Sequence, residues 1–249
     1  MDDLTEILER LRAQHSSTGS KSEYECPDCR DTGFVMRDIG NGIQIAQRCR
    51  CYIMRRSRER MERSGLSEEL HRKTFNNFDT QNMPQLINAK VKAQQYVQNF
   101  TAFEHERCNS IMFSGQSGAG KTHIGTAICN GLMEQGIAVV YMAYRNAITK
   151  IKQILTDEIG YERELDKYMQ DRVLYIDDLL KGKVTESDIN ILYEIINYRY
   201  MNNKPIIIST EKSQVELLEF DEAIGSRIIE MCRGNIVQLR GKELNYRLS

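Results

Sequence analysis

The chain has 249 residues, a length that suits one large domain or a medium domain with a small module. Its 34 basic and 35 acidic residues exclude a nucleic-acid binder that relies on gross positive charge. No apolar run approaches the roughly 18–20 residues of a membrane-spanning helix, and the acidic, amphipathic N-terminus is unlike a signal peptide. Seven cysteines in a chain of this size argue against a secreted disulfide scaffold. We expect a cytoplasmic α/β protein with no membrane partner.

The first 70 residues differ in pattern from the rest and are expected to form an N-terminal module. Apolar residues at helical spacing predict a short amphipathic helix at 3–12, which either docks a partner or caps the module. A polar, serine-rich stretch at 15–23 reads as a linker. Residues 48–63 hold seven arginines against two glutamates and predict a helix that ends at the Ser-Gly-Leu of 64–66. This basic helix binds phosphates or an acidic protein face, or is simply solvated.

Four cysteines are concentrated in this module. Cys26 and Cys29 form a C-x-x-C pair, and Cys49 and Cys51 follow after residues that resemble a zinc-ribbon hairpin. Four thiolates that converge on one point satisfy tetrahedral zinc, so we predict a structural zinc site; reduced thiols or a redox pair are the alternative. The remaining cysteines are expected to be small buried residues: Cys108, Cys129 and Cys232.

From about residue 109 the chain alternates short apolar runs with helical patterns. The predicted strands are 111–114, 138–143, 173–176, 206–209 and 236–239. The predicted helices are 122–134, 145–155, 161–170, 186–201 and an interrupted pattern at 215–231. Such alternation indicates an α/β fold with a parallel sheet and crossover helices.

Residues 115–122 read GQSGAGKT and match the phosphate-binding pattern G-x-x-x-x-G-K-[ST]. The match lies between a predicted strand and a predicted helix, where backbone N–H groups and the helix N-terminus hold phosphate oxygens. We therefore predict an ATP site in which Lys121 reaches the β- and γ-phosphates and the Thr122 hydroxyl binds magnesium. The other nucleotide-binding residues predicted here are Gly115, Gly118, Ala119, Gly120 and His123.

A second apolar strand ends in two carboxylates, in the sequence LYIDDL. Asp177 is predicted to hold the magnesium, usually through water, as P-loop enzymes present such a residue. Asp178 points elsewhere by strand alternation and is predicted to polarise the attacking water as a general base.

Several motifs together resemble one family of AAA+ proteins. The stretches are GQSGAGKTH, LYIDDL, EIINYRY, PIIIST and SRIIE with GKELNYR. They are similar to the ATPase domain of the DnaC/DnaI group of replicative-helicase loaders, with the transposition helper IstB as a close cousin, over roughly residues 70–249. The resemblance implies a sheet of order 5-1-4-3-2, no full helical lid, self-association through the ATP site, and a ring helicase and single-stranded DNA as partners.

The same resemblance implies roles for three further residues. Arg227 matches the arginine finger that reaches a neighbouring subunit's nucleotide, and Arg247 matches the second sensor arginine in the same subunit. Thr210 ends the first sensor strand and is expected to hydrogen-bond a water or a γ-phosphate oxygen, but Glu211 stands where the family commonly has asparagine. A carboxylate there repels phosphate unless it points away, so slow hydrolysis is expected.

The loader resemblance also implies a helical insertion that follows single-stranded DNA, here residues 145–170. Its candidate contacts are Arg145, Lys150, Lys152 and a stacking Tyr144; a plain solvated helix is the alternative. Phe75 and Phe78 precede the first strand and are expected beside the adenine or in the core.

The sequence thus predicts an ATP-dependent loader that places a replicative ring helicase on single-stranded DNA. Residues 1–70 are the zinc-binding, helicase-contacting module and residues 71–249 the AAA+ ATPase domain. The alternatives are an IstB-like transposition helper and an ATP-binding adaptor without significant hydrolysis.

Overall fold

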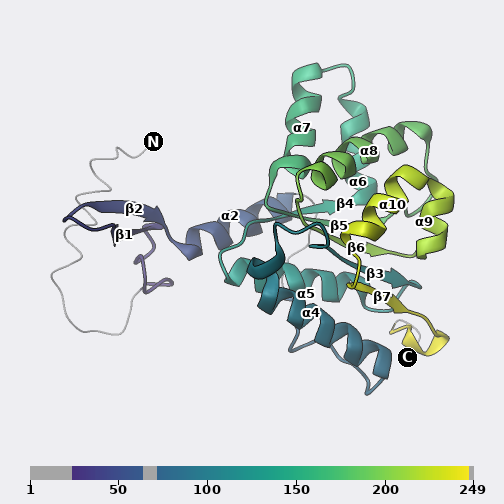
Figure 1. Cartoon of the computed structure of the whole chain (residues 1–249), viewed down its shortest axis with the longest axis horizontal. Helices are drawn as coiled ribbons and strands as arrows, with labels where there is room; N and C mark the ends of the chain where they lie inside the picture. The colour runs from purple at the N-terminus through teal and green to yellow at the C-terminus, as the bar shows by residue number, and fades with distance from the viewer. Residues whose placement is uncertain (1–23, 64–71, 247–249) are drawn as a thin grey trace. The chain divides into compact units, whose positions relative to one another are not determined.

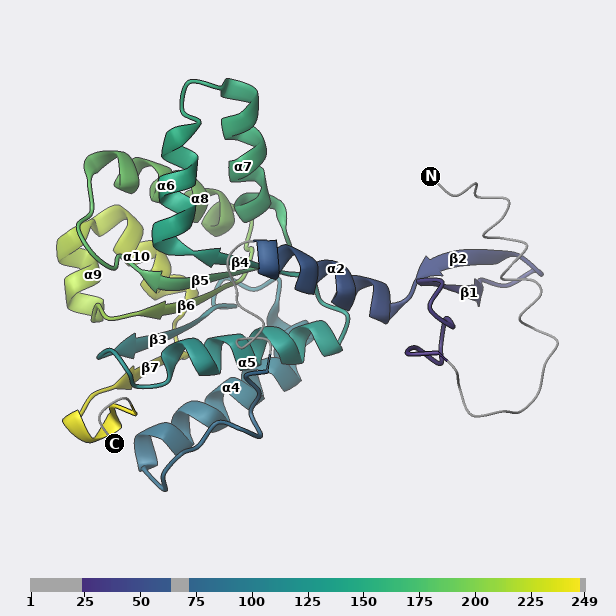
Figure 2. The same cartoon turned by 180° about the vertical axis from the view of Figure 1, so that it is seen from behind.

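The computed structural model describes residues 24–63 and 72–246 of the chain, which Figures 1 and 2 show from opposite sides. The chain separates into two compact units, Met1–Arg56 and Ser57–Ser249. None of the described helices is both long enough and apolar enough to cross a membrane.

Four of the sequence-based predictions fall outside the described residues. They are the helix at 3–12, the linker at 15–23, the helix break at 64–66 and the sensor residue Arg247. The module boundary expected at residue 70 also lies there, so it stays a prediction.

The N-terminal unit contains a two-stranded antiparallel hairpin. β1 (Phe34–Asp38) pairs with β2 (Gln44–Arg48). Gly40 and Gly42 in the turn have φ values of +97° and +74°, a region that glycine adopts without a steric penalty. The arginine-rich helix α2 (Arg50–Arg63) begins directly after the hairpin. The predictions of a hairpin and of a basic helix after it are confirmed.

The second unit is built on a five-stranded parallel sheet. Its strands are β3 (Ile111–Gly115), β4 (Val139–Ala143), β5 (Val173–Leu179), β6 (Ile206–Thr210) and β7 (Ile236–Leu239). The order across the sheet is β4-β5-β6-β3-β7, which confirms the expected order 5-1-4-3-2. Every residue of the central strands β3 and β6 is buried, as expected for strands covered on both faces.

Helices cover both faces of this sheet. They are α4 (Pro84–Phe103), α5 (Lys121–Glu134), α6 (Tyr144–Gln153), α7 (Glu158–Gln170), α8 (Glu186–Met201), α9 (Gln214–Phe220), α10 (Glu222–Met231) and the short 3-10 helix η2 (Lys242–Leu244). α4 and α5 lie on one side of the sheet, and α6 to α10 lie on the other (Figures 1 and 2). Met112, Leu174 and Ile208 face the α6–α10 side and pack in its core.

Strand register brings polar side chains together on the face that α5 covers. Tyr141 on β4 lies beside Tyr175 on β5, and Tyr175 lies beside Ile207 on β6. Because side chains alternate between the two faces of a strand, Asp177 and Ser209 share the face of these neighbours. The carboxyl ends of three strands thus present hydroxyl and carboxylate groups to the start of α5.

The sequence analysis missed helix α4, the 20-residue helix before the first strand of the sheet. Pro84 stands in its first turn, where the missing N–H is tolerated. Its buried residues follow helical spacing: Leu86, Ala89, Ala93, Tyr96, Val97 and Phe100. Two of them are alanines among lysines and glutamines, and this dilution weakens the apolar pattern.

Side-chain caps set two helix boundaries that periodicity did not give. α7 begins at Glu158 rather than at 161, because the carboxylate of Asp157 accepts a hydrogen bond from Gly160 N. The interrupted pattern at 215–231 divides at Asp221, whose extended backbone ends α9 and whose side chain caps α10 through Ile224 N at 2.8 Å.

Candidate functional site

The loop between β3 and α5 adopts a conformation that requires its glycines. Gly115, Gly118 and Gly120 have φ values of +145°, +81° and +78°. A Cβ on Gly115 would lie 2.0 Å from the carbonyl oxygen of Leu239 on β7, so no larger residue fits there. The loop leads directly into the N-terminus of α5, where free backbone N–H groups favour an anion.

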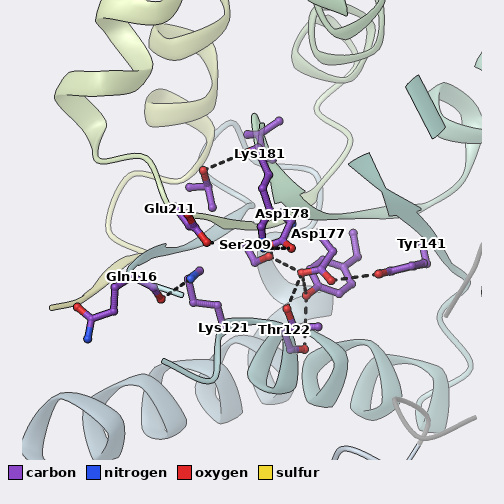
Figure 3. A network of polar contacts seen from close by, with 12 residues as sticks. Gln116, Lys121, Thr122, Tyr141, Asp177, Asp178, Lys181, Ser209 and Glu211 are labelled. Carbon is purple, nitrogen blue, oxygen red and sulfur yellow. Dashed lines mark hydrogen bonds and ion pairs between the residues drawn. The ribbon is translucent and has the colours of Figure 1, made fainter. Parts of the chain in front are cut away.

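Lys121 begins α5 and turns back over the loop. Its Nζ donates to the carbonyl of Gln116 at 2.7 Å, as Figure 3 shows. Burial lowers the pKa of Lys121, while the carboxylates of Glu211 and Asp178 oppose that shift. The Gln116 side chain in turn accepts from Gly241 N at 3.1 Å and donates to the Gly241 carbonyl, which ties the loop to the segment after β7.

Asp177 lies at the centre of a hydroxyl network on the α5 face (Figure 3). Its Oδ1 accepts from Thr122 Oγ1 at 3.0 Å, from Tyr175 OH at 2.8 Å and from Ser209 Oγ, while its Oδ2 accepts from Tyr141 OH at 3.0 Å. A hydroxyl and a carboxylate side by side at the phosphate loop are the oxygen ligands that magnesium takes, so these two groups fit the metal. The sequence analysis did not identify the hydroxyls of Tyr141, Tyr175 and Ser209 as partners of Asp177. Polar residues at alternate positions of these strands could have indicated them.

Asp178 points away from this network. Its φ is +55°, its backbone N donates to Ser209 Oγ at 2.9 Å, and the strand pairing is irregular between residues 176 and 179. The carboxylate forms an ion pair with Lys181 Nζ at 2.8 Å, and the same ammonium lies 3.6 Å from Glu211 Oε1. Two carboxylates therefore face the loop with a lysine between them, and the sequence analysis did not identify Lys181.

These groups line one cavity of about 380 Å³. Its walls are formed by Lys73, Asn77, Phe78, Asp79, Ser117, Gly118, Gly120, Lys121, Thr122, His123, Asp178, Lys181, Glu211 and Tyr246. Phe78 is buried with its ring edge close to Gly120, whereas Phe75 lies half-buried near Gly131 of α5. Phosphate-binding, carboxylate and aromatic groups converge here on a volume that suits a nucleotide.

His123 links the loop helix to the segment before α4. Its Nε2 lies 3.0 Å from both Thr74 O and Asn77 Oδ1, two acceptors, so this nitrogen carries the proton and donates. Its ring stacks edge-on against Phe78, with 5.1 Å between the ring centroids. Burial lowers the pKa of His123, which keeps the imidazole neutral near pH 7.

Five of the described residues predicted for the ATP site do not line the cavity. Gly115 and Asp177 are described above, and the other three are Thr210, Ala119 and Arg227. The Thr210 hydroxyl is buried and donates to the carbonyl of Leu179 at 2.8 Å. Ala119 is buried beneath the loop, so only its backbone can serve a ligand. Arg227 on α10 extends over the rings of Tyr193 and Tyr200 on α8, 5.3 and 5.4 Å from their centroids. Their roles stay predictions.

Comparison with known proteins agrees with this geometry. A model of the IstB-like ATP binding protein family matches residues 45–244. The chain belongs to the IstB-like ATP-binding family. This confirms the resemblance to the group of helicase loaders and IstB proteins on which the sequence-based prediction rests.

Relatives of this IstB-like protein include phage-element and replication proteins. It is 34% identical to the phage-like element PBSX protein XkdC of Bacillus subtilis, over 100% of this chain and 95% of that protein. It is 26% identical to the replicative helicase loader DnaC of Escherichia coli K12, over 93% of this chain and 89% of that protein. Its fold is similar to the crystal structure of DnaI, with a TM-score of 0.59, 21% identity, and coverage of 71% of this chain and 95% of that one.

The N-terminal unit of this IstB-like protein brings its four cysteines together. The Sγ atoms of Cys26, Cys29, Cys49 and Cys51 lie within 4.8 Å of one another. Cys26 and Cys49 Sγ are 3.7 Å apart, close to the spacing of about 3.8 Å that tetrahedral zinc–sulfur bonds produce. Arg55 Nη2 lies 3.5 Å from Cys51 Sγ and offsets negative charge. Four soft ligands in this arrangement fit a zinc ion.

The remaining cysteines follow the prediction in two cases of three. Cys129 and Cys232 are fully buried in the ATPase unit, as expected. Cys108 is only half-buried, so the expectation of a buried residue there is wrong. It lies in the short loop between α4 and β3, which leaves one side open.

The α6–α7 insertion corrects the prediction of a stacking role for Tyr144. Tyr144 is 1% exposed and packs in the core beneath α6, so it offers no stacking surface. The basic candidates are paired within the protein: Lys152 with Asp188 at 2.8 Å, Lys150 with Glu164 at 3.0 Å, and Arg145 with the Lys183 carbonyl at 2.7 Å. Asp188 and Glu164 are buried carboxylates, so Lys152 and Lys150 offset buried negative charge. The DNA-contact roles of the three basic residues stay predictions.

Proposed function

We propose that this chain is an ATP-dependent loader that binds a replicative ring helicase and places it on single-stranded DNA. The observation that carries the proposal is the cavity where the glycine loop, Lys121, Thr122 and Asp178 converge above Asp177. The chain has this cavity within a family of ATP-binding proteins, and its relationship to a helicase loader extends over nearly its whole length.

The loop N–H groups and Lys121 bind the ATP phosphates. Lys121 breaks its hydrogen bond to the Gln116 carbonyl and donates to phosphate oxygens instead. Thr122 and Asp177 would hold the magnesium ion that accompanies ATP. The metal supplies positive charge that neutralises the developing charge on the β- and γ-phosphates. Phe78, beside Gly120, and Tyr246 are the aromatic groups that border the base.

Hydrolysis requires Asp178 to accept a proton from the attacking water. The water oxygen bonds to the γ-phosphorus, the bond to the β–γ bridging oxygen breaks, and ADP leaves. Lys181 has to release Asp178 first, because the ion pair holds the carboxylate toward the ammonium. Arg227 lies away from its own cavity, which suits a finger that reaches the nucleotide of a neighbouring subunit in an oligomer.

The N-terminal unit is proposed to engage the helicase, with zinc holding its hairpin. Ile39, Ile43 and Ile45 of the hairpin are 57%, 55% and 43% exposed. The exposed isoleucines suit an apolar patch on the helicase. The arginine-rich helix α2 suits acidic residues around that patch.

An adaptor that binds ATP without significant hydrolysis is the second candidate. The observation that favours it is the ion pair between Lys181 and Asp178, which engages the carboxylate that would activate water. An IstB-like transposition helper is the third, and it follows from family membership alone.

The first prediction tests the loader directly. The tagged full-length chain should retain the host's hexameric helicase in an ATP-dependent manner, and Lys121→Ala should lose the ATP dependence because the phosphates lose their buried cation. Helicase capture by affinity purification and ATP turnover are measured on the same samples.

The controls separate the three candidates. Asp178→Asn should bind ATP but turn it over at least tenfold more slowly. Equal turnover in wild type and Asp178→Asn supports the adaptor. Failure to retain the helicase, together with tight binding of duplex DNA, supports the transposition helper.

A further inference from the structure

Two buried tyrosines reach Asp177, Tyr175 from its own strand β5 and Tyr141 from the neighbouring strand β4. Tyr175 OH donates to Asp177 Oδ1 at 2.8 Å and Tyr141 OH donates to Asp177 Oδ2 at 3.0 Å. Tyr175 is 0% exposed and Tyr141 is 4% exposed. Their rings pack against each other with 5.4 Å between the centroids (Figure 3 shows Tyr141 beside Asp177). A hydroxyl therefore holds each oxygen of the carboxylate.

Helix α5 is shaped to admit one of these hydroxyls. A Cβ on Gly125 would lie 2.5 Å from Tyr175 OH and 2.6 Å from the ring carbon that carries it. Glycine in a helix interior is less stable than alanine, so its presence one turn after the phosphate loop needs a local reason. The space above Gly125 is that reason, because it lets Tyr175 lie under Thr122 and reach Asp177.

The hydroxyls are not required by packing alone. A phenylalanine fills the same apolar volume without burying a polar group, and burial of a phenolic oxygen is unfavourable unless it is hydrogen-bonded. At both contacts the carboxylate of Asp177 is the acceptor, so each phenol donates its hydroxyl proton to it.

We propose that Tyr141 and Tyr175 are positioning residues that fix the orientation of Asp177 for magnesium. The proposal rests on the ATP site proposed above and deepens it. With donors on both oxygens, the carboxylate cannot rotate about its χ2 angle without breaking a hydrogen bond. Asp177 is thereby held toward Thr122 before any nucleotide arrives, and hydrogen-bond partners of this kind typically change metal affinity when removed.

The test measures how nucleotide binding depends on magnesium. A fluorescent ATP analogue is titrated with the full-length protein in EDTA and then over a range of Mg²⁺ concentrations. Tyr141→Phe and Tyr175→Phe should each raise the Mg²⁺ concentration for half-maximal tight binding about tenfold, with unchanged affinity in EDTA. Gly125→Ala should shift it in the same direction, because the new Cβ displaces Tyr175.

A third tyrosine provides the matched control. Tyr144 is equally buried, and its hydroxyl has no hydrogen-bond partner among the described residues. Tyr144→Phe should leave the Mg²⁺ dependence unchanged, so a shift confined to the two Asp177 partners supports the proposal.

The other outcomes overturn it. Identical Mg²⁺ dependence in wild type and both phenylalanine variants shows that the hydroxyls do not position Asp177. An equal loss of affinity in EDTA, or failure of both variants to fold, assigns the tyrosines to the fold alone. If the wild-type protein binds no ATP under any condition, the proposed ATP site itself is wrong, and this inference falls with it.

Discussion

At the scale of single residues, Lys181 sets the charge balance beside the phosphate-binding loop. Its ammonium lies between Asp178 and Glu211 at the mouth of the phosphate cavity. The three side chains are 38% to 45% exposed, so the pairs are partly screened by solvent. An arriving triphosphate competes with both carboxylates for this lysine. The residue therefore lowers repulsion between the phosphates and a site that carries two acidic groups.

This leads to a prediction about a single substitution. Lys181→Ala should weaken ATP binding about three- to tenfold, because Asp178 and Glu211 then face the phosphates without a cation between them. Adding Glu211→Gln to the same chain should restore most of the affinity, since one of the two negative charges is removed. Binding of a fluorescent ATP analogue at fixed Mg²⁺ measures both effects.

A nearby lysine tests whether net charge alone is responsible. Lys183 is exposed and lies outside the cavity lining, so Lys183→Ala changes the total charge by the same amount without altering the cavity. The explanation is wrong if Lys183→Ala weakens binding as much as Lys181→Ala, or if the double variant binds no better than Lys181→Ala.

At the scale of elements, the joint between β3 and α5 depends on close approach to β7. The backbone of Gly115 lies so near the Leu239 carbonyl that a Cβ cannot be accommodated by a rotamer change. Gly115→Ala should lower the free energy of unfolding by about 3 kcal/mol or more, from the left-handed φ and the collision with backbone. Urea denaturation measures this change.

Gly234 offers the comparison for that prediction. It also has a positive φ, +85°, but a Cβ there meets open space. Gly234→Ala should therefore lower the free energy of unfolding by only about 1–2 kcal/mol, the cost of the positive φ. Equal losses at the two positions would show that the approach to β7 does not constrain the loop.

The sequence predicted elements whose pattern is local. Central strands are continuous apolar runs, and the glycine loop is a fixed spacing of residues that each have a steric or chemical function. α4 was missed because small alanines make much of its buried face, and the division at Asp221 depends on one side-chain cap. The spacing of apolar residues along the chain reveals neither helix α4 nor the division at Asp221.

The sequence predicted the parts of the site that follow one another along the chain. Lys121 and Thr122, and Asp177 with Asp178, are each adjacent within one motif. Tyr141 and Ser209 meet Asp177 only because three strands align in one register, and a single sequence does not give that register. Tyr144 was misread for a related reason: the residue after β4 begins a helix whose inner face is core.

At the scale of the whole molecule, the two units rely on different sources of stability. In the described part of the N-terminal unit the buried core consists of Cys26, Cys29 and Cys49, with Val35 and Cys51 packed against them. The four cysteines fit a zinc ion, and we expect a bound ion to add folding free energy to this unit. The ATPase unit has an extensive apolar core on the α6–α10 side of its sheet.

This difference predicts that metal and nucleotide binding can be separated. Cys26→Ser or Cys49→Ser should reduce bound zinc from about one ion per chain to a small fraction of that, because tetrahedral sites need all four thiolates. ATP binding should stay within about twofold of wild type, since the glycine loop and Asp177 belong to the other compact unit. Metal analysis and analogue binding on one sample measure both, with Cys108→Ser, outside the cluster, as the control that keeps its zinc. Retention of zinc by both cluster variants would exclude the four-cysteine site, and parallel loss of zinc and ATP binding would show that the units fold as one.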